Sequence, residues 1–409
     1  MKLQPPSSQT QKAFTLFFCA VIGLLFSQSA LATTYYSQTA GVAAPATLAS
    51  WNTVRLGGGS APTVFTGAGD IFVVQGTGNG GTSPHTVTGT AAWAVTATVQ
   101  VENGATLNQG DGTTASATAL FTFGTFQIDN GGTYVVNYKH GTSGSATSIP
   151  GTAKSFGASS TVEIKLWGDG TGTSLVALPS SVTWGNLKIN ISITMAASWQ
   201  QAGAVTTING NLTVTATGGT TRAFRFVTTT TVTVTVAGDV TVNGGILDLA
   251  STTGVVTLNV GGNLTVSSGT LTGGASATPQ LIKFTGGANA TPTFTAGGTL
   301  TITFMNFQVA SGKILTLAGN LPIASGRSMT VDSGGTLATG VTFAPVSGST
   351  IAINGTFTIN QGGFASTQAF TYGASGTLVF NNSTGTYGPI DATHVYWPSA
   401  SGQIGRAHV

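Results

Sequence analysis

A short phrase recurs along this chain and limits what the chain can fold into. It consists of Gly, a polar residue, an apolar residue, Thr or Pro, and then Val or Ile. Two apolar residues at positions i and i+2 point to one face of a β-strand, and the residue between them points to the other. The phrase therefore predicts a strand with one buried face, entered through a glycine turn. Its copies are Gly210-Asn-Leu-Thr-Val214, Gly238-Asp-Val-Thr-Val242, Gly262-Asn-Leu-Thr-Val266, Gly298-Thr-Leu-Thr-Ile302, Gly319-Asn-Leu-Pro-Ile323 and Gly355-Thr-Phe-Thr-Ile359.

The spacing of these phrases predicts an all-β, right-handed parallel β-helix. The steps between the glycines are 28, 24, 36, 21 and 36 residues, and repeats of about 20 to 50 residues are typical of solenoids. A second phrase interleaves with the first, as Asn103-Gly-Ala-Thr-Leu107, Ser268-Gly-Thr-Leu271 and Ser333-Gly-Gly-Thr-Leu337. Tandem β-sandwiches are the alternative, although the six Trp residues do not follow the regular spacing typical of such domains.

The composition excludes several other classes of protein. Charged residues make up 6% of the chain and Gly contributes 59 residues, which suits neither a helix-rich enzyme nor a charged disordered segment. If Lys2, Lys12 and Arg406 lie outside the mature protein, its 13 basic residues fall to 10, which equals the number of acidic residues. We therefore expect no nucleic-acid partner, because no basic stripe exists to displace counterions.

The N-terminus has the features of a secretory signal peptide over residues 1–32. A polar start containing Lys2 and Lys12 precedes an apolar run over residues 13–26, and Ala30-Leu-Ala32 offers a small-residue cleavage site. The run has 14 residues, fewer than the roughly 20 that span a bilayer. We expect a bacterial protein exported to the cell surface or medium, with no membrane span in the mature chain. Cys19 is the only cysteine, so disulfides cannot stabilise the mature protein.

The remaining chain divides into three predicted parts. Residues 33–101 are expected to form an N-terminal β cap and the first coils, because a solenoid needs atypical end units. Residues 102–403 are expected to form the repeat region. Residues 404–409 are expected to be a non-native tail, because codons for Ile404-Gly-Arg-Ala-His-Val409 can reproduce a common sequencing adapter. On this hypothesis a longer natural protein has lost its C-terminal part.

Several segments resemble the β-strand-repeat surface proteins of Bacteroidetes that are exported by the type IX secretion route. They are Thr34-Tyr-Tyr-Ser-Gln38, Ser50-Trp-Asn52, Ala61-Pro-Thr-Val-Phe65, Gly69-Asp-Ile-Phe-Val-Val74, Val182-Thr-Trp-Gly-Asn-Leu187 and Gly376-Thr-Leu-Val-Phe-Asn-Asn382. The resemblance covers most of residues 33–400 and implies a fold and an export route. It transfers no functional residue, and the C-terminal sorting domain of that family is not part of this sequence.

Parallel β-helices also include polysaccharide lyases and hydrolases, which need clustered carboxylates. The ten acidic residues are scattered, although stacking could bring Asp239 and Asp248 together. Asp111 and Asp169 are each flanked by glycines, an arrangement that only distantly resembles a calcium loop. We expect turn residues at these positions and predict no catalytic, metal-binding or cofactor-binding residue. The acidic residues are Asp70, Glu102, Asp111, Asp129, Glu163, Asp169, Asp239, Asp248, Asp332 and Asp391.

Other residue types offer weaker candidates. His85, His140 and His394 are too far apart in sequence to indicate a metal site. Arg222 and Arg225, the only close basic pair, are expected in an exposed turn. Aromatic side chains could stack on sugars, or they could fill the cap and the core; the candidates are Tyr35, Tyr36, Trp51, Trp167 and Trp397.

The sequence predicts a non-enzymatic, adhesin-like or structural presentation module, secreted or held at the cell surface. An extracellular glycan or surface ligand is the expected class of partner, and no cofactor is expected. The alternatives are a polysaccharide-binding or polysaccharide-degrading β-helix, and a structural spacer for a lost C-terminal domain.

Overall fold

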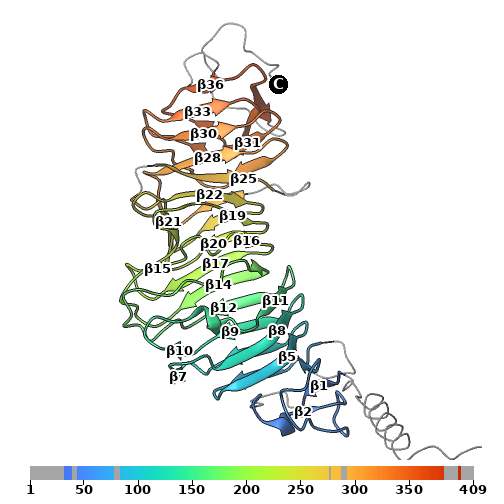
Figure 1. The fold of residues 1–409 in the computed structure, drawn as a ribbon. Coiled ribbons are helices and arrows are strands. Elements are labelled where there is room, and N and C mark those ends of the chain that lie inside the picture. The colour runs from blue at the N-terminus through green and yellow to red at the C-terminus, as the bar shows by residue number, and fades with distance from the viewer. Residues whose placement is uncertain are drawn as a thin grey trace, which may run out of the picture.

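The computed structural model describes residues 32–38, 44–77, 83–275, 278–286, 293–381 and 395–397. In these residues the chain winds into an elongated stack of coils, with the first and last strands at opposite ends (Figure 1). The described residues contain strands and two short 3₁₀ turns, η1 (Leu48–Ser50) and η2 (Ala146–Ser148). No helix in these ranges is long and apolar enough to cross a membrane.

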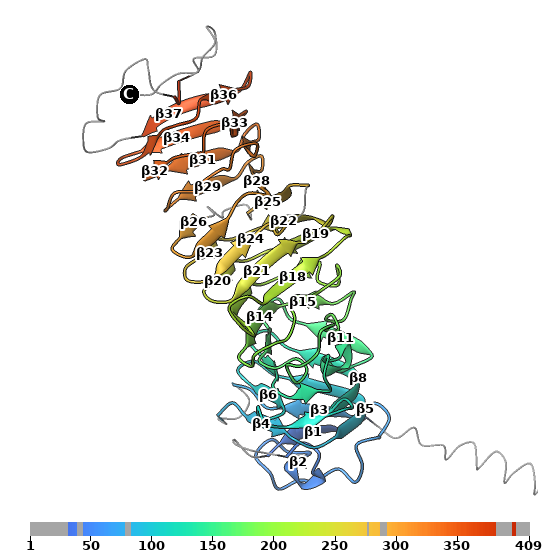
Figure 2. The same ribbon diagram turned by 90° about the vertical axis from the view of Figure 1, so that its left-hand side faces the viewer.

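Sheet B runs along the stack and contains thirteen strands (Figure 2). All of its pairings are parallel, so each strand lies on the equivalent strand of the preceding coil. In order the strands are β4 (Thr86–Gly89), β6 (Thr106–Gln109), β9 (Thr133–Val136), β12 (Thr161–Ile164), β14 (Asn186–Ile191), β17 (Leu212–Thr217), β20 (Val240–Val242), β23 (Leu264–Val266), β26 (Thr293–Ala296), β29 (Ile314–Leu317), β31 (Thr336–Thr339), β34 (Thr356–Asn360) and β37 (Thr377–Asn381).

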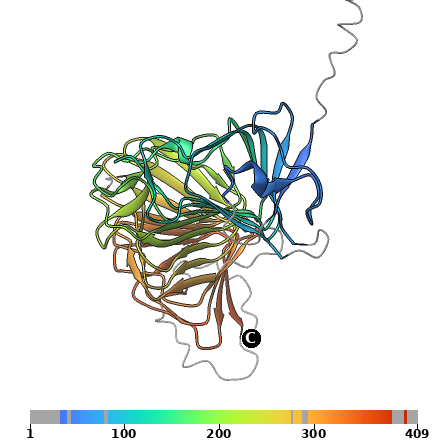
Figure 3. The ribbon, with the colours of Figure 1, turned by 90° about the horizontal axis from the view of Figure 1, so that it is seen from below.

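Two further parallel sheets complete the later coils. Seen from below, the coils lie behind one another (Figure 3). Sheet D contains β13 (Thr183–Trp184), β16 (Thr207–Ile208), β19 (Thr231–Val236), β22 (Val255–Val260), β25 (Gln280–Phe284), β28 (Met305–Val309), β30 (Ser328–Val331), β33 (Thr350–Ile353) and β36 (Phe370–Tyr372). Sheet E contains β15 (Trp199–Gln200), β18 (Ala223–Val227), β21 (Ile246–Ala250), β24 (Thr270–Thr272) and β27 (Thr299–Thr301). Two-stranded sheets pair β7 (Ala115–Ser116) with β10 (Lys139–His140), and β32 (Thr342–Phe343) with β35 (Phe364–Ala365).

Sheet A forms the first coils opposite the start of sheet B. Its strands are β1 (Thr34–Ser37), β2 (Trp51–Asn52), β3 (Ile71–Val74), β5 (Trp93–Val101), β8 (Phe121–Ile128) and β11 (Ala153–Phe156). The outermost strand, β2, runs antiparallel to β1. It places Trp51 on Trp93, with ring centroids 5.3 Å apart, and so covers the apolar core at this end.

The sequence prediction of an all-β parallel β-helix is confirmed. Tandem β-sandwiches are wrong, because sandwich domains are built from antiparallel sheets, whereas β1 with β2 is the only antiparallel pair among the described strands.

The core consists of columns of apolar side chains that repeat once per coil. One column of sheet B passes through Leu187, Leu212, Val240, Leu264 and Phe294, all of which are fully buried. Leu212, Val240 and Leu264 are apolar positions that the recurring phrase predicts to point inward. Burial of such side chains stabilises a fold by about 1.5–3 kcal/mol each.

The Gly-Asn or Gly-Asp pair that opens the phrase has a specific structural cause. The Asn186 Oδ1 atom accepts the backbone N–H of Asn211 at 2.8 Å, Asn211 Oδ1 accepts that of Asp239 at 2.7 Å, and Asp239 Oδ1 accepts that of Asn263 at 2.7 Å. The preceding residue must be glycine, because a Cβ atom on Gly238 would lie 2.2 Å from Asn211 Oδ1. We call Asn186, Asn211, Asp239 and Asn263 the amide ladder.

The phrase does not mark a single sheet, contrary to the simplest interpretation of its spacing. Gly298-Thr-Leu-Thr-Ile302 forms β27 in sheet E, whereas the copies at Gly210 and Gly355 form β17 and β34 in sheet B. The copy at Gly319 forms no strand, because Pro322 has no N–H group to donate to a ladder. The 36- and 21-residue steps between glycines are therefore not coil lengths.

Candidate functional site

The carboxylates are engaged in contacts within the fold. Of the ten acidic residues, Asp391 lies outside the described residues, and each of the other nine accepts a hydrogen bond from the protein. In seven cases the donor lies 23 or more residues away. These donors are Thr33 for Asp70, Arg55 and Gly76 for Glu102, Gln100 for Asp129, Asn190 for Glu163, Asn263 for Asp239, Arg225 for Asp248, and Gln308 for Asp332.

Asp239 and Asp248 do not form the acidic pair that stacking could have produced. Asp239 belongs to the amide ladder. Asp248 lies in β21 and its Oδ2 atom is 2.5 Å from Arg225 Nε, on the adjacent strand β18. Burial raises the pKa of the Asp248 carboxyl, and its buried Oδ1 atom has no hydrogen-bond partner among the residues that the structure describes. The expectation that Arg222 and Arg225 occupy an exposed turn is wrong for Arg225, because it lies within a strand.

The two Gly-Asp-Gly segments are turns closed by their own carboxylates. Asp111 Oδ1 accepts the backbone N–H groups of Thr113 and Thr114 at 2.9 and 2.8 Å, which holds the pKa of this carboxyl well below its usual range. Asp169 Oδ1 accepts the N–H of Thr171 at 2.8 Å, and bonds from the same residue lower its pKa. Within the described residues, no three His, Cys, Asp or Glu side chains lie together in a metal-binding arrangement.

The two described histidines lie in separate buried polar clusters, and His394 lies outside the described residues. His85 Nδ1 is 2.7 Å from Ser37 Oγ, and Ser37 is 1% exposed. A serine this deeply buried cannot reach a substrate, although the Ser–His pair has the spacing of a nucleophile and its base. His140 Nδ1 is 2.6 Å from the Tyr138 hydroxyl. Burial lowers the pKa of both imidazoles.

Four of the five aromatic candidates pack against other rings. Trp51 and Trp167 are buried, and the Trp167 ring lies 4.6 Å from that of Trp199. Tyr35 stacks on Phe72 at 5.3 Å. Tyr36 lies under the Arg55 guanidinium at 4.2 Å. Trp397 packs on Phe380 at 5.6 Å, at the last described coil.

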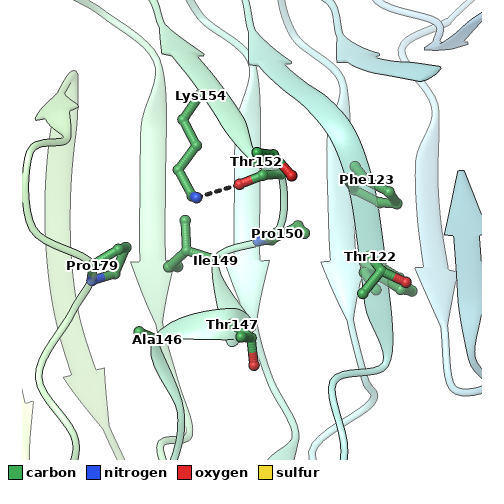
Figure 4. Close-up of a pocket in the computed structure, with 11 residues that line it drawn as sticks. Thr122, Phe123, Ala146, Thr147, Ile149, Pro150, Thr152, Lys154 and Pro179 are labelled. Carbon is green, nitrogen blue, oxygen red and sulfur yellow. Dashed lines mark hydrogen bonds between the residues drawn. The ribbon is translucent and has the colours of Figure 1, made fainter. Parts of the chain in front are cut away.

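A cleft of about 300 Å³ opens where sheet A ends, and its lining includes a lysine (Figure 4). Phe123 and Thr122 of β8, Ile149 and Pro150 after η2, Thr152 and Lys154 near β11, and Pro179 contribute to the wall. Figure 4 shows the Lys154 side chain extended between Pro179 and Thr152. Its ammonium donates to the Gly151 carbonyl, and burial lowers its pKa.

Lys154 was not among the residues predicted from the sequence, although the local pattern contains a signal for it. Alternation in Ala153-Lys-Ser-Phe156 places Lys154 on the same face as Phe156, and the strand register pairs Lys154 with the buried Phe126. A lysine at an inward strand position is unusual, because it places a charge beside apolar neighbours. The hollow around Lys154 depends on where sheet A stops, which local sequence does not specify.

A second hollow, of about 350 Å³, lies where sheets B and E meet. Uncharged residues line it: Thr215, Ala216, Thr217, Gly219, Thr220, Gly245, Ile246, Ser268, Gly269 and Thr270. The lining of this hollow contains no charged side chain, so the lysine cleft is the stronger candidate site.

Comparisons with protein-family models, curated proteins and solved structures find no match to this chain. Its function is therefore inferred from the geometry of its own residues.

Proposed function

We propose that this protein is a non-enzymatic rod, secreted or held at the bacterial surface, that presents binding surfaces away from the cell. The observation that carries the proposal is the use of its carboxylates. Seven of the nine described acidic residues bond to a residue 23 or more positions away, and Asp111 and Asp169 close their own turns. Carboxylates that cross-link coils serve the scaffold instead of acid–base chemistry.

The stacking of sheet B supports a mechanical role. Thirteen strands at a spacing of about 4.8 Å give a sheet about 58 Å tall. Each coil is held to the next by backbone ladders, apolar columns and, in the central coils, the amide ladder. A rod of this kind resists local opening, because unfolding one coil breaks contacts with the coils above and below.

The proposed location follows from the leader predicted over residues 1–32, and the proposed export route follows from the resemblance to type IX surface proteins. The test is expression of the full chain with its own leader in a Gram-negative host. We expect protein outside the inner membrane with Thr33 as its first residue. Retention of an uncleaved chain in the cytoplasm would contradict the proposed location.

The non-enzymatic role is tested on the same exported protein. We expect no release of reducing or unsaturated ends from pectin, alginate or similar polysaccharides, with or without calcium. Beads coated with the protein should adhere to surfaces that carry its ligand, whereas heat-denatured protein should not support adhesion. Sustained polysaccharide cleavage by homogeneous protein would overturn the proposal.

A further inference from the structure

The lysine cleft exists because the cross-section of the stack changes at β11. Sheet A ends with β11, and β13 of the following coil begins sheet D without pairing to it. The Phe156 and Trp184 rings still lie 5.9 Å apart across this junction. Among the described strands, none of a following coil pairs with β11 over Lys154, so the inward position that Lys154 occupies opens into the cleft.

The charge of Lys154 is not neutralised within the described fold. The described ion pairs are Arg55 with Glu102, Lys188 with Glu163, and Arg225 with Asp248. Lys154 instead donates to one backbone carbonyl, although an ammonium group carries three donor hydrogens. A partly buried cation with donors to spare attracts an anion, and the weakened screening in a cleft strengthens that attraction.

The walls of the cleft select the kind of anion. Part of the wall is apolar surface, contributed by Phe123, Ile149, Pro150 and Pro179. A bare inorganic ion makes no favourable contact with such a surface. The exposed side chains of Thr122 and Thr152 add two hydroxyl groups, for which the structure gives no hydrogen bond to another described residue. A sugar acid has C–H faces, hydroxyl groups and a carboxylate, and so matches all three wall chemistries.

We propose that this cleft binds a uronic-acid residue of an acidic polysaccharide, with the carboxylate on Lys154 and the hydroxyls on Thr122 and Thr152. The volume of about 300 Å³ is at the lower end of small-molecule sites, so one or two sugar residues fill it. The rest of the polymer continues outside, because the cleft is open to solvent. The site deepens the proposed function, since it would give the rod an extracellular ligand.

The test is calorimetric titration of the exported protein with trigalacturonate and with its methyl ester, in which each charged carboxylate is replaced by a neutral ester that carries one added methyl group. We expect binding of the acid and little binding of the ester. We expect Lys154→Met to weaken acid binding on the order of tenfold or more, because a charge-assisted hydrogen bond is lost. Lys283→Met, which removes a half-buried lysine of sheet D, is the matched control and should bind like the parent protein.

Several outcomes would overturn the proposal. They are the absence of acid binding, equal binding of acid and ester, equal losses in Lys154→Met and Lys283→Met, and full competition by inorganic phosphate. An unchanged melting temperature in Lys154→Met shows that the variant is folded, and Thr122→Val with Thr152→Val provides a second test that keeps the lysine. Small-angle scattering of the same samples reports the rod separately, so failure of the ligand proposal can be distinguished from failure of the proposed scaffold.

Discussion

The amide ladder makes a quantitative prediction about why glycine precedes each Asn or Asp. In Asn211→Ala the backbone N–H of Asp239 loses its 2.7 Å acceptor, which should lower the free energy of unfolding by about 1 kcal/mol. In Gly238→Ala the new Cβ atom would lie 2.2 Å from Asn211 Oδ1 and 2.8 Å from the Gly210 carbonyl oxygen. The Asn211 side chain must then move and lose the same bond, and the backbone clash adds about 1 kcal/mol, giving about 2 kcal/mol in total.

The double variant separates this explanation from a general intolerance of glycine replacement. With Asn211 already truncated, Gly238→Ala should cost only the backbone clash, so the pair should lose about 2 kcal/mol rather than the sum of about 3 kcal/mol. Urea unfolding followed by circular dichroism, at an unchanged m-value, measures all four proteins. Gly340→Ala is the control, because its Cβ atom would meet nothing closer than 3.7 Å. Additive losses, or a Gly340→Ala cost as large as that of Gly238→Ala, would refute the explanation.

Three further predictions concern the core, the histidines and one strained residue. Leu264→Ala should lower the free energy of unfolding by about 2–5 kcal/mol, because Leu264 is fully buried. Thr265→Ala, on the outer face of the same strand, should change it by less than about 0.5 kcal/mol. Equal effects of the two variants in urea unfolding would contradict the assigned faces. Burial lowers the pKa of His85 and His140, so their contribution to stability is fully present above the unfolded pKa of about 6.5 and is lost as pH falls through the lower folded values. Replacing both histidines with Gln should reduce the change of melting temperature with pH below about 6.5. An unchanged slope of melting temperature against pH would argue against the lowered pKa values. Ala202 has φ 51°, so Ala202→Gly should stabilise the protein by about 0.5–1 kcal/mol, and a lower midpoint in urea would count against strain there.

The sequence was sufficient to predict the direction of side chains within strands. In the copies at Gly210, Gly238, Gly262 and Gly355, the two apolar residues of the phrase are buried and the Thr between them faces outward. This follows from strand geometry alone. The order of strands around the coil could not be obtained in the same way. Copies of one phrase serve sheets B and E, because both sheets demand the same local alternation.

The lysine cleft could not be predicted from local sequence. The inward position of Lys154 follows from alternation, but the hollow beside it depends on β13 failing to pair with β11. Likewise, the acidic residues were expected in solvated turns, as Asp111 and Asp169 are. Arg225 and Asp248 are register partners, and register is set by the lengths of all the turns between the two strands.

The amide ladder gives the stack a direction of growth. From Asn186 to Asn263 each side-chain acceptor lies on the earlier coil and each backbone donor on the later one. In a chain that emerges from its N-terminus, the side-chain acceptors of each of these coils are therefore in place before the backbone N–H donors of the next coil emerge. Every finished coil acts as a template for its successor, and the next strand can add without waiting for distant parts of the chain. Folding can thus keep pace with the emergence of the chain.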